Sequence, residues 1–304
     1  MIYESILDTI GNTPLIRLSR IKNELGLQSD IYAKVESFNP SGSIKDRPAY
    51  KMINEALKAG LIHKDTVMIE ETSGNMGIAL AMIAADLGLQ LIVVMPDTMS
   101  KERIRMMQAY GAKVVLSDGK KGMAGTKEKR EELMAAHPDH FLPSQFMNQN
   151  NPLAHFENTA QEIINDLNDL DYFIAGIGTG GTISGAAKYF KEKDLAVKVI
   201  GVEPSDSPLL TKGIAGPHKI QGIGANFKPD ILAQDLIDEI VDVTYEKAIE
   251  AMKLLHRYEG IFAGISSGAA LSAAIDKAKE KDKKIAVILP DSFDRYLSLE
   301  GIYD

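Results

Sequence analysis

The stretch DYFIAGIGTGGTISG spans residues 171–185, where an apolar strand pattern runs through a glycine-rich turn into a helix pattern. A strand that feeds directly into a helix is the building unit of an α/β fold. The turn also gathers backbone N–H groups at the positive end of the helix dipole, an arrangement that binds phosphate. Thr179 and Thr182 add hydroxyl donors. The stretch therefore predicts a site for a compact phosphate monoester.

The same turn admits two other interpretations. Gly176, Gly178 and Gly181 satisfy the glycine pattern of dinucleotide-binding folds, and Glu203 ends the next strand, where an acid that binds ribose would lie. This pattern keeps a nicotinamide-dependent oxidoreductase open as an alternative. A tight connection that binds no ligand is the third interpretation, so the turn alone does not decide the function.

Strand and helix patterns alternate along almost the whole chain. The strand patterns are continuous apolar runs, which are typical of parallel sheets covered by helices on both faces. We therefore predict an α/β protein with parallel sheets flanked by helices. The predicted strands span residues 31–35, 67–69, 91–95, 113–116, 172–175, 197–202 and 284–289. The predicted helices span residues 49–57, 76–87, 101–110, 126–135, 154–167, 182–191, 245–257 and 269–279.

Two irregular regions interrupt this alternation. Residues 137–151 contain Pro138, Pro143 and a polar run, which indicate a seam between two α/β domains. Ligands commonly bind in the cleft between such domains. Residues 204–225 are rich in glycine, and an irregular connection of this length predicts a functional lid.

Composition excludes several classes of protein. The 304 residues are enough for two domains, and the net charge of −8 with a pI near 5.4 argues against nucleic-acid binding. No apolar run is long enough to span a membrane. There is no cysteine and the six histidines are scattered, so we predict no disulfide, no thiol nucleophile and no metal site. Residues 1–5 lack the basic start of a signal peptide, which predicts a cytoplasmic location.

A lysine stands where a helix is expected to begin. Residues 41–48 read SGSIKDRP, in which Ser43 is a suitable N-cap and Pro48 fits the first helical turn. The positive end of the helix dipole disfavours a charged amine there by about 0.3–1 kcal/mol. Lys45 is therefore either an incidental surface lysine or an amine with a lowered pKa, which is a nucleophile that forms Schiff bases.

Two more turns at predicted helix starts carry polar groups. Thr72, Ser73 and the adjacent N–H groups suit a carboxylate, and Asn75 can bind a phenolic oxygen. In the second turn, Ser266 offers a neutral hydroxyl to a buried ring nitrogen. Simple helix capping is the alternative for each turn. Taken with Lys45 and the phosphate turn, these groups match what pyridoxal phosphate requires.

The motifs resemble, in the same order along the chain, those of the cysteine synthase (O-acetylserine sulfhydrylase) and cystathionine β-synthase family of fold type II pyridoxal-phosphate enzymes. The resemblance begins at residues 10–15, IGNTPL, and covers essentially the whole chain. It implies a tryptophan synthase β-like fold with a cofactor in the cleft between two domains. The smaller, mobile domain would be residues 35–148 and would carry the loop that binds the substrate, residues 72–75. The larger domain would be residues 1–34 and 149–304 and would carry the phosphate turn, residues 178–182.

The resemblance assigns a role to each motif. It implies that Lys45 holds the cofactor as a Schiff base and acts as the catalytic base. The implied cofactor-binding residues are Lys45, Asn75, Gly178, Thr179, Gly180, Gly181, Thr182 and Ser266, with Asn75 at the 3′ oxygen and Ser266 at the pyridine nitrogen. The implied substrate-binding residues are Thr72, Ser73, Gly74, Met76, Gln145 and Gly222. Met76 replaces the threonine usual in the family, and Asn226 stands where cysteine synthases usually have glycine.

The implied reaction is a β-replacement, because a neutral serine at the ring nitrogen favours loss of a β-leaving group. It forms L-cysteine from O-acetyl-L-serine and sulfide, and homocysteine as an acceptor would give cystathionine. The alternative is a cystathionine β-synthase proper, which uses serine or O-acetylserine with homocysteine and releases sulfide in a side reaction. Residues 201–208 and 216–225 resemble the first group, whereas residues 151–155 and 289–292 resemble the second. The resemblance also implies a homodimer, and it makes the C-terminal tail of serine acetyltransferase a candidate partner.

Overall fold

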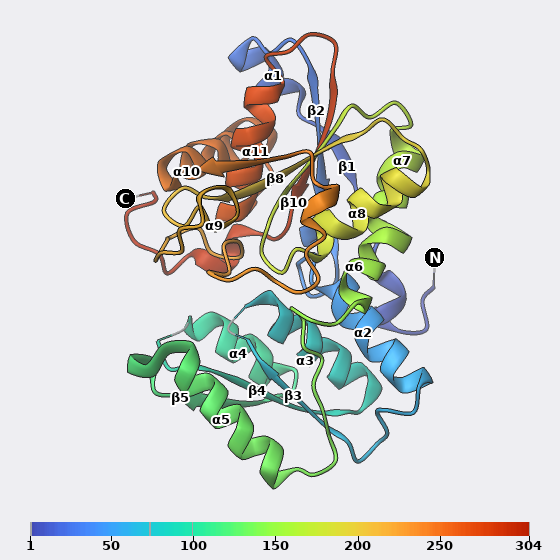
Figure 1. Cartoon of the computed structure of the whole chain (residues 1–304), viewed down its shortest axis with the longest axis vertical. Helices are drawn as coiled ribbons and strands as arrows, with labels where there is room; N and C mark the ends of the chain where they lie inside the picture. Colours follow the sequence, from blue (N-terminus) through green and yellow to red (C-terminus); the bar gives the residue numbers. More distant parts are fainter. Residues whose placement is uncertain (1, 73, 99, 304) are drawn as a thin grey trace.

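Two separate sheets, each flanked by helices, organise the chain (Figure 1). The computed structural model describes residues 2–72, 74–98 and 100–303, without the side chains of residues 123 and 124. The six-stranded sheet has the order β1-β2-β10-β7-β8-β9 and is parallel except for β1. The four-stranded sheet has the order β5-β4-β3-β6 and is parallel throughout. The predicted α/β fold with parallel sheets is confirmed.

The strands of the larger sheet are β1 (Leu15–Arg17), β2 (Asp30–Val35), β7 (Tyr172–Gly176), β8 (Lys198–Pro204), β9 (Glu239–Val243) and β10 (Lys284–Leu289). Those of the smaller sheet are β3 (Val67–Glu71), β4 (Gln90–Pro96), β5 (Lys113–Ser117) and β6 (His140–Phe141). All seven predicted strands are present. The strands of the smaller sheet fall within residues 35–148, and the exact domain boundaries stay a prediction.

The helices cover both faces of each sheet. They are α1 (Ser19–Leu25), α2 (Asp46–Lys58), α3 (Asn75–Leu87), α4 (Lys101–Ala109), α5 (Gly122–Ala136), α6 (Asn150–Ala154), α7 (Ala160–Asp166), α8 (Gly181–Glu192), α9 (Leu209–Lys212), α10 (Tyr245–Leu254) and α11 (Ile265–Lys277). A π-helical turn, His155–Thr159, joins α6 to α7, so one predicted helix is three short segments. In the described part of the chain, no helix combines the length and hydrophobicity needed to cross a membrane.

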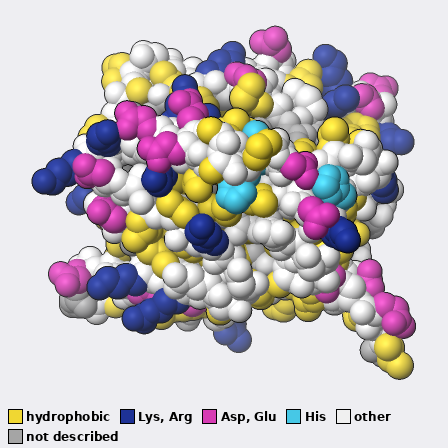
Figure 2. Space-filling model, turned by 90° about the horizontal axis from the view of Figure 1, so that it is seen from below, with side chains coloured by type: hydrophobic (Ala, Val, Ile, Leu, Met, Phe, Trp, Pro, Cys, Tyr) yellow, Lys and Arg dark blue, Asp and Glu magenta, His cyan; other side chains and the backbone are white. Residues whose placement is uncertain are grey.

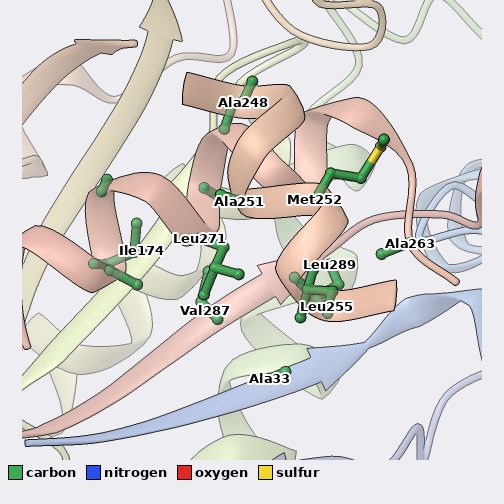
Figure 3. Close-up of a cluster of buried hydrophobic side chains, with 14 of the residues drawn as sticks. Ala33, Ile174, Ala248, Ala251, Met252, Leu255, Ala263, Leu271, Val287 and Leu289 are labelled. Carbon is green, nitrogen blue, oxygen red and sulfur yellow. The ribbon is translucent and has the colours of Figure 1, made fainter. Parts of the chain in front are cut away.

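The main core lies between the larger sheet and the pair α10 and α11. Figure 3 shows Ala251 of α10, Leu271 of α11 and Val287 of β10 in this layer, and all three are buried. A second cluster around Phe173 and Phe190 fills the opposite face under α7 and α8. Because side chains on both faces of these strands are buried, the strand sequences are continuous apolar runs instead of alternating ones.

The helix that follows Lys45 begins later than the sequence suggested. Helix α2 starts at Asp46 with Lys45 as its N-cap, and the Ser43 hydroxyl accepts from the Lys45 N–H at 3.2 Å. The prediction of Ser43 as the N-cap was therefore wrong by two residues. Pro48 lies in the first turn, where the missing N–H has no helical partner to lose.

A buried ion cluster fixes the start of α2 against the larger sheet. The Arg47 guanidinium donates to Glu36 at 2.7 Å and to Glu162 at 2.6 Å, and Lys34 pairs with Glu162 at 2.7 Å. Burial alone would raise the pKa of Glu162, but hydrogen bonds from Arg47 and Lys34 hold it at about 2. On the face of the molecule in Figure 2, acidic and basic side chains lie interspersed, and exposed pairs contribute only about 0–1 kcal/mol.

Replacing Arg47 with methionine should lower the free energy of unfolding by about 3–5 kcal/mol, because it leaves the buried Glu36 carboxylate without its partner. Urea denaturation followed by circular dichroism measures the loss. The control is Arg17→Met, which breaks the half-exposed pair with Asp30 and should cost less than about 1 kcal/mol. Equal losses in the two variants would contradict the role given to Arg47.

Candidate active site

Lys45 lies in the loop that joins β2 to α2, and this loop is tied to the segment after β10. The Ile44 N–H donates to the Pro290 carbonyl at 2.8 Å, and Ser43 forms an isolated bridge with Asp291. Burial lowers the pKa of Lys45 from 10.5 to about 8, while the Asp291 carboxylate opposes this shift. The neutral fraction of the amine near physiological pH is therefore larger than that of an ordinary lysine, which favours a nucleophilic role.

The phosphate turn connects β7 to α8 as the sequence predicted. Gly180 is the N-cap of α8, and Gly181 is its first residue. A Cβ added to Gly178 would lie 2.4 Å from the Gly222 carbonyl oxygen, so only glycine allows the 204–225 segment to approach this closely. Thr179 is buried and Thr182 is partly buried, so both hydroxyls belong to the turn and not to the open surface.

The second predicted turn joins β3 to α3. Thr72 is buried, and its hydroxyl accepts from the Gly74 N–H at 3.3 Å. Gly74 is the N-cap of α3, and Ser73 lies outside the described residues. Met76 is 1% exposed and packs in the core of the smaller sheet, so its backbone, but not its side chain, is available to a ligand.

Ser266 lies in the first turn of α11 and is 2% exposed. Among the described residues, its hydroxyl has no hydrogen-bond partner. A Cβ on Gly222 would lie 3.6 Å from Ser266 Oγ, and the Gly222 carbonyl faces Gly178. The structure thus brings the phosphate turn, the predicted lid and the start of α11 together.

Gln145 lies in the segment between β6 and α6. Its carbonyl accepts from Asn151 Nδ2 at 2.8 Å. Burial raises the pKa of Glu70 to about 7, and N–H bonds from Ser144 and Gln145 partly oppose this shift. The Ser144 N–H lies 3.0 Å from the Glu70 carboxylate. Glu70, at the end of β3, therefore anchors the segment that carries Gln145.

The segment predicted to be a lid is largely irregular and contains only the short helix α9. Asn226, which follows it, has a positive φ of 61°, and its Oδ1 accepts from the Ser207 hydroxyl at 2.6 Å. Phe227 packs edge-on against Phe146, with 4.9 Å between ring centroids. Asn226, which stands where cysteine synthases usually have glycine, therefore connects the two ends of this segment through its side chain.

Asp291 is the site residue that sequence reasoning missed. Its Oδ2 accepts from Asn75 Nδ2 and from the Tyr296 hydroxyl, both at 2.6 Å, and Asn75 Oδ1 accepts from Arg295 at 2.8 Å. Its Oδ1 is buried without a partner among the described residues. Its position after β10 was a usable signal, because functional groups gather at the carboxyl ends of parallel strands.

Asp291→Asn should lower the pKa of Lys45 below about 8, because it removes the carboxylate that stabilises the charged amine. The pH dependence of the reaction of Lys45 with an amine-selective reagent, measured in cofactor-free protein, reports this value. The control is Asp276→Asn, which changes an exposed acid on α11. An unchanged or raised Lys45 pKa in the Asp291 variant would contradict the assignment.

Glu70→Gln should alter the pH dependence of stability. The pKa of Glu70 is raised from 4.5 to about 7 in the folded protein. The contribution of its protonated form to the free energy of unfolding is therefore complete below pH 4.5 and is lost as the pH rises through 7. Glutamine retains an acceptor oxygen but never becomes charged. The variant should therefore be more stable relative to the parent at pH 8 than at pH 5, as denaturant unfolding at both values would measure. The exposed control Glu131→Gln should show a pH-independent difference.

The chain matches the family model of pyridoxal-phosphate dependent enzymes over residues 6–291. This protein belongs to that family. Cysteine synthase B of Campylobacter jejuni is 50% identical over 301 residues, which cover 98% of each chain. A hydrogen sulfide-producing enzyme from Fusobacterium nucleatum has a TM-score of 0.94 at 50% identity, covering 98% of this chain and 99% of that chain. An O-acetylserine dependent cystathionine β-synthase from Helicobacter pylori has a TM-score of 0.92 at 40% identity, covering 100% of both.

The residues present fit the cofactor of this family. The turn at the start of α8 offers backbone N–H groups and two hydroxyls, and Lys45 offers an amine with a lowered pKa. Ser266, a residue that is 2% exposed, offers a hydroxyl that no other described residue occupies. The nicotinamide alternative is wrong. Glu203, its ribose-binding candidate, instead accepts from the Leu210 and Thr211 N–H groups at 2.9 Å each.

Proposed function

We propose that this protein forms L-cysteine from O-acetyl-L-serine and sulfide by β-replacement. The observation that carries the proposal is the Lys45 amine, whose pKa burial lowers to about 8 at the start of α2. An amine with this pKa binds an aldehyde covalently and can also accept a proton near neutral pH. The relative named cysteine synthase B, which aligns with nearly the whole chain, supports the same reaction.

Bound pyridoxal phosphate would supply the electron withdrawal that weakens the Cα–H bond of the amino-acid substrate. In the proposed site, Gly178, Thr179, Gly180, Gly181 and Thr182 bind the phosphate. Asn75 binds the phenolic oxygen, and Ser266 donates to the ring nitrogen without charging it. A neutral ring nitrogen favours departure of a β-leaving group.

The substrate is held on the side of the smaller sheet. We assign its carboxylate to Thr72, Ser73, Gly74, the Met76 backbone and Gln145, with Gly222 closing the site. The Lys45 amine would take the Cα proton of the substrate as the general base. The Asp291 carboxylate stabilises the resulting ammonium, because it raises the pKa of Lys45.

Formation of cystathionine from homocysteine is the second candidate. The similarity to the Helicobacter pylori enzyme favours it, and the relative from Fusobacterium nucleatum makes release of hydrogen sulfide a side activity to measure. Asn226, which directly follows the predicted lid, accepts from the Ser207 hydroxyl within it, whereas cysteine synthases usually have glycine at the position of Asn226. We further propose a homodimer in the cytoplasm, with the C-terminal tail of serine acetyltransferase as a candidate partner.

The test supplies the purified enzyme with O-acetylserine, serine or cysteine as donor and with sulfide or homocysteine as acceptor. We expect the highest kcat/KM for O-acetylserine with sulfide, with cysteine identified by mass spectrometry. Lys45→Ala should reduce turnover by about 10²–10⁴-fold, because it removes the base. Lys58→Ala, at the exposed end of the same helix, is the matched control. Turnover of serine with homocysteine alone would overturn the cysteine synthase proposal.

A further inference from the structure

Two buried polar side chains lie directly behind the phosphate turn, on consecutive helical segments that have no role in the proposed function. Asn151 of α6 and His155 of the π-helical turn are each 1% exposed. They are four residues apart, so they lie on the same helical face. Asn151 Nδ2 is 3.1 Å from Thr179 Oγ1, and His155 Nε2 is 3.3 Å from Thr182 Oγ1. Each of the two side chains thus contacts one threonine of the turn.

We propose that Asn151 and His155 are positioning residues that direct the hydroxyl hydrogens of Thr179 and Thr182 toward the phosphate of pyridoxal phosphate. This inference deepens the proposed function, because it names the groups that orient the phosphate-binding hydroxyls. Neither side chain needs to touch the phosphate itself.

The hydrogen bonds of Thr179 determine where its hydrogen can point. A hydroxyl has one hydrogen to donate and two lone pairs to accept. Thr179 Oγ1 accepts from Asn151 Nδ2 and from the Gly181 N–H at 3.4 Å, so both lone pairs are used. The hydrogen is then free to donate to an anion in the turn. Without Asn151, the hydroxyl could rotate and present a lone pair to the phosphate instead.

His155 can act on Thr182 in the same way. Burial lowers the pKa of His155 well below 6.5, and the charges of Arg47 and Lys45 lower it further, so the ring is neutral and carries one N–H. Its Nδ1 lies 2.9 Å from Thr159 Oγ1. With the hydrogen on Nε2, the ring donates to Thr182 and accepts from Thr159. The Thr182 hydrogen is then available for the phosphate, whereas the other tautomer would consume it.

The element that carries these side chains is packed tightly on the start of α8. Helices α6 and α8 lie side by side (Figure 1), and a Cβ on Gly181 would lie 1.9 Å from Asn151 Oδ1. A Cβ on Gly185 would lie 2.1 Å from the Pro152 carbonyl oxygen. The close approach explains why this turn has glycine at its helical end and why Asn151 and His155 have little freedom to move.

The test compares binding of pyridoxal 5′-phosphate and of pyridoxal, which lacks the phosphate, to the full-length protein after cofactor removal. Visible absorbance measures both affinities. His155→Phe and Asn151→Leu should each weaken pyridoxal 5′-phosphate binding by about tenfold or more, since each disturbs a hydrogen bond to a charged group. Pyridoxal binding should change by less than about twofold. Equal weakening of both ligands, or no weakening of either, would overturn the proposal.

Two further variants separate positioning from general support of the fold. In a Thr182→Val background, His155→Phe should cause no additional loss, because the hydroxyl that it orients is gone. Thr159→Val should also weaken pyridoxal 5′-phosphate binding selectively, because it removes the partner that fixes the ring tautomer. If His155→Phe does not fold, the Thr159 variant decides, and unchanged selectivity in it would overturn the role of His155.

The binding test and the turnover test fail independently. Selective loss of pyridoxal 5′-phosphate affinity without any cysteine formation by the parent would leave this inference standing and would refute the proposed reaction. Cysteine formation with equal loss of pyridoxal and pyridoxal 5′-phosphate binding would refute this inference alone.

Discussion

The arrangement of the site depends on the contacts that the buried residue Asp291 makes. It accepts from Asn75 at the start of α3 and from Tyr296 near the C-terminus, and its backbone pairs with Ser43 beside the lysine loop. The Gly264 N–H, just before α11, donates to the Asp291 carbonyl at 3.0 Å. One residue thus joins segments from both sheets around Lys45. It also stabilises the charged form of the lysine, which burial alone would disfavour more strongly.

Parallel topology explains why residues so distant in the sequence meet there. The strands β2, β7 and β10 run in the same direction in the larger sheet, so their carboxyl ends share one edge. The lysine loop follows β2, the phosphate turn follows β7, and Asp291 follows β10. The smaller sheet adds the turn after β3 in the same manner. The buried cluster of Arg47, Glu36 and Glu162 then fixes α2 against this edge, which sets the position of the preceding lysine.

The sequence was most informative where local rules apply. The central strands were predictable because both of their faces are buried and their residues are all apolar. The strands that were not predicted, β1, β6 and β9, lie at sheet edges. β1 and β6 are only three and two residues long, and β9 mixes charged with apolar residues. The placement of Lys45, the phosphate turn and Ser266 at helix starts was predictable, because capping and glycine patterns are local signals.

The other side chains around the site could not be predicted from local patterns. Asn75 and Asp291 are 216 residues apart, and no spacing rule connects them. His155 and Asn151 are read locally as ordinary helix residues, and their polar partners appear only when α6 packs on α8. At Met76 the sequence pattern was misleading in the other direction. Methionine in place of the family's usual threonine suggested a change in the binding motif, but the side chain packs in the apolar core.

Asn151 links the phosphate turn to the segment that carries Gln145. The same Nδ2 atom donates to Thr179 in the phosphate turn and to the Gln145 carbonyl in the substrate segment. A shift of either partner therefore changes the geometry available to the other. In the proposed site, with the cofactor phosphate on the turn and the substrate carboxylate near Gln145, any effect that this amide transmits from one ligand to the other would be equal in both directions. One amide group thus joins two segments that are six and twenty-eight residues away from it in the sequence.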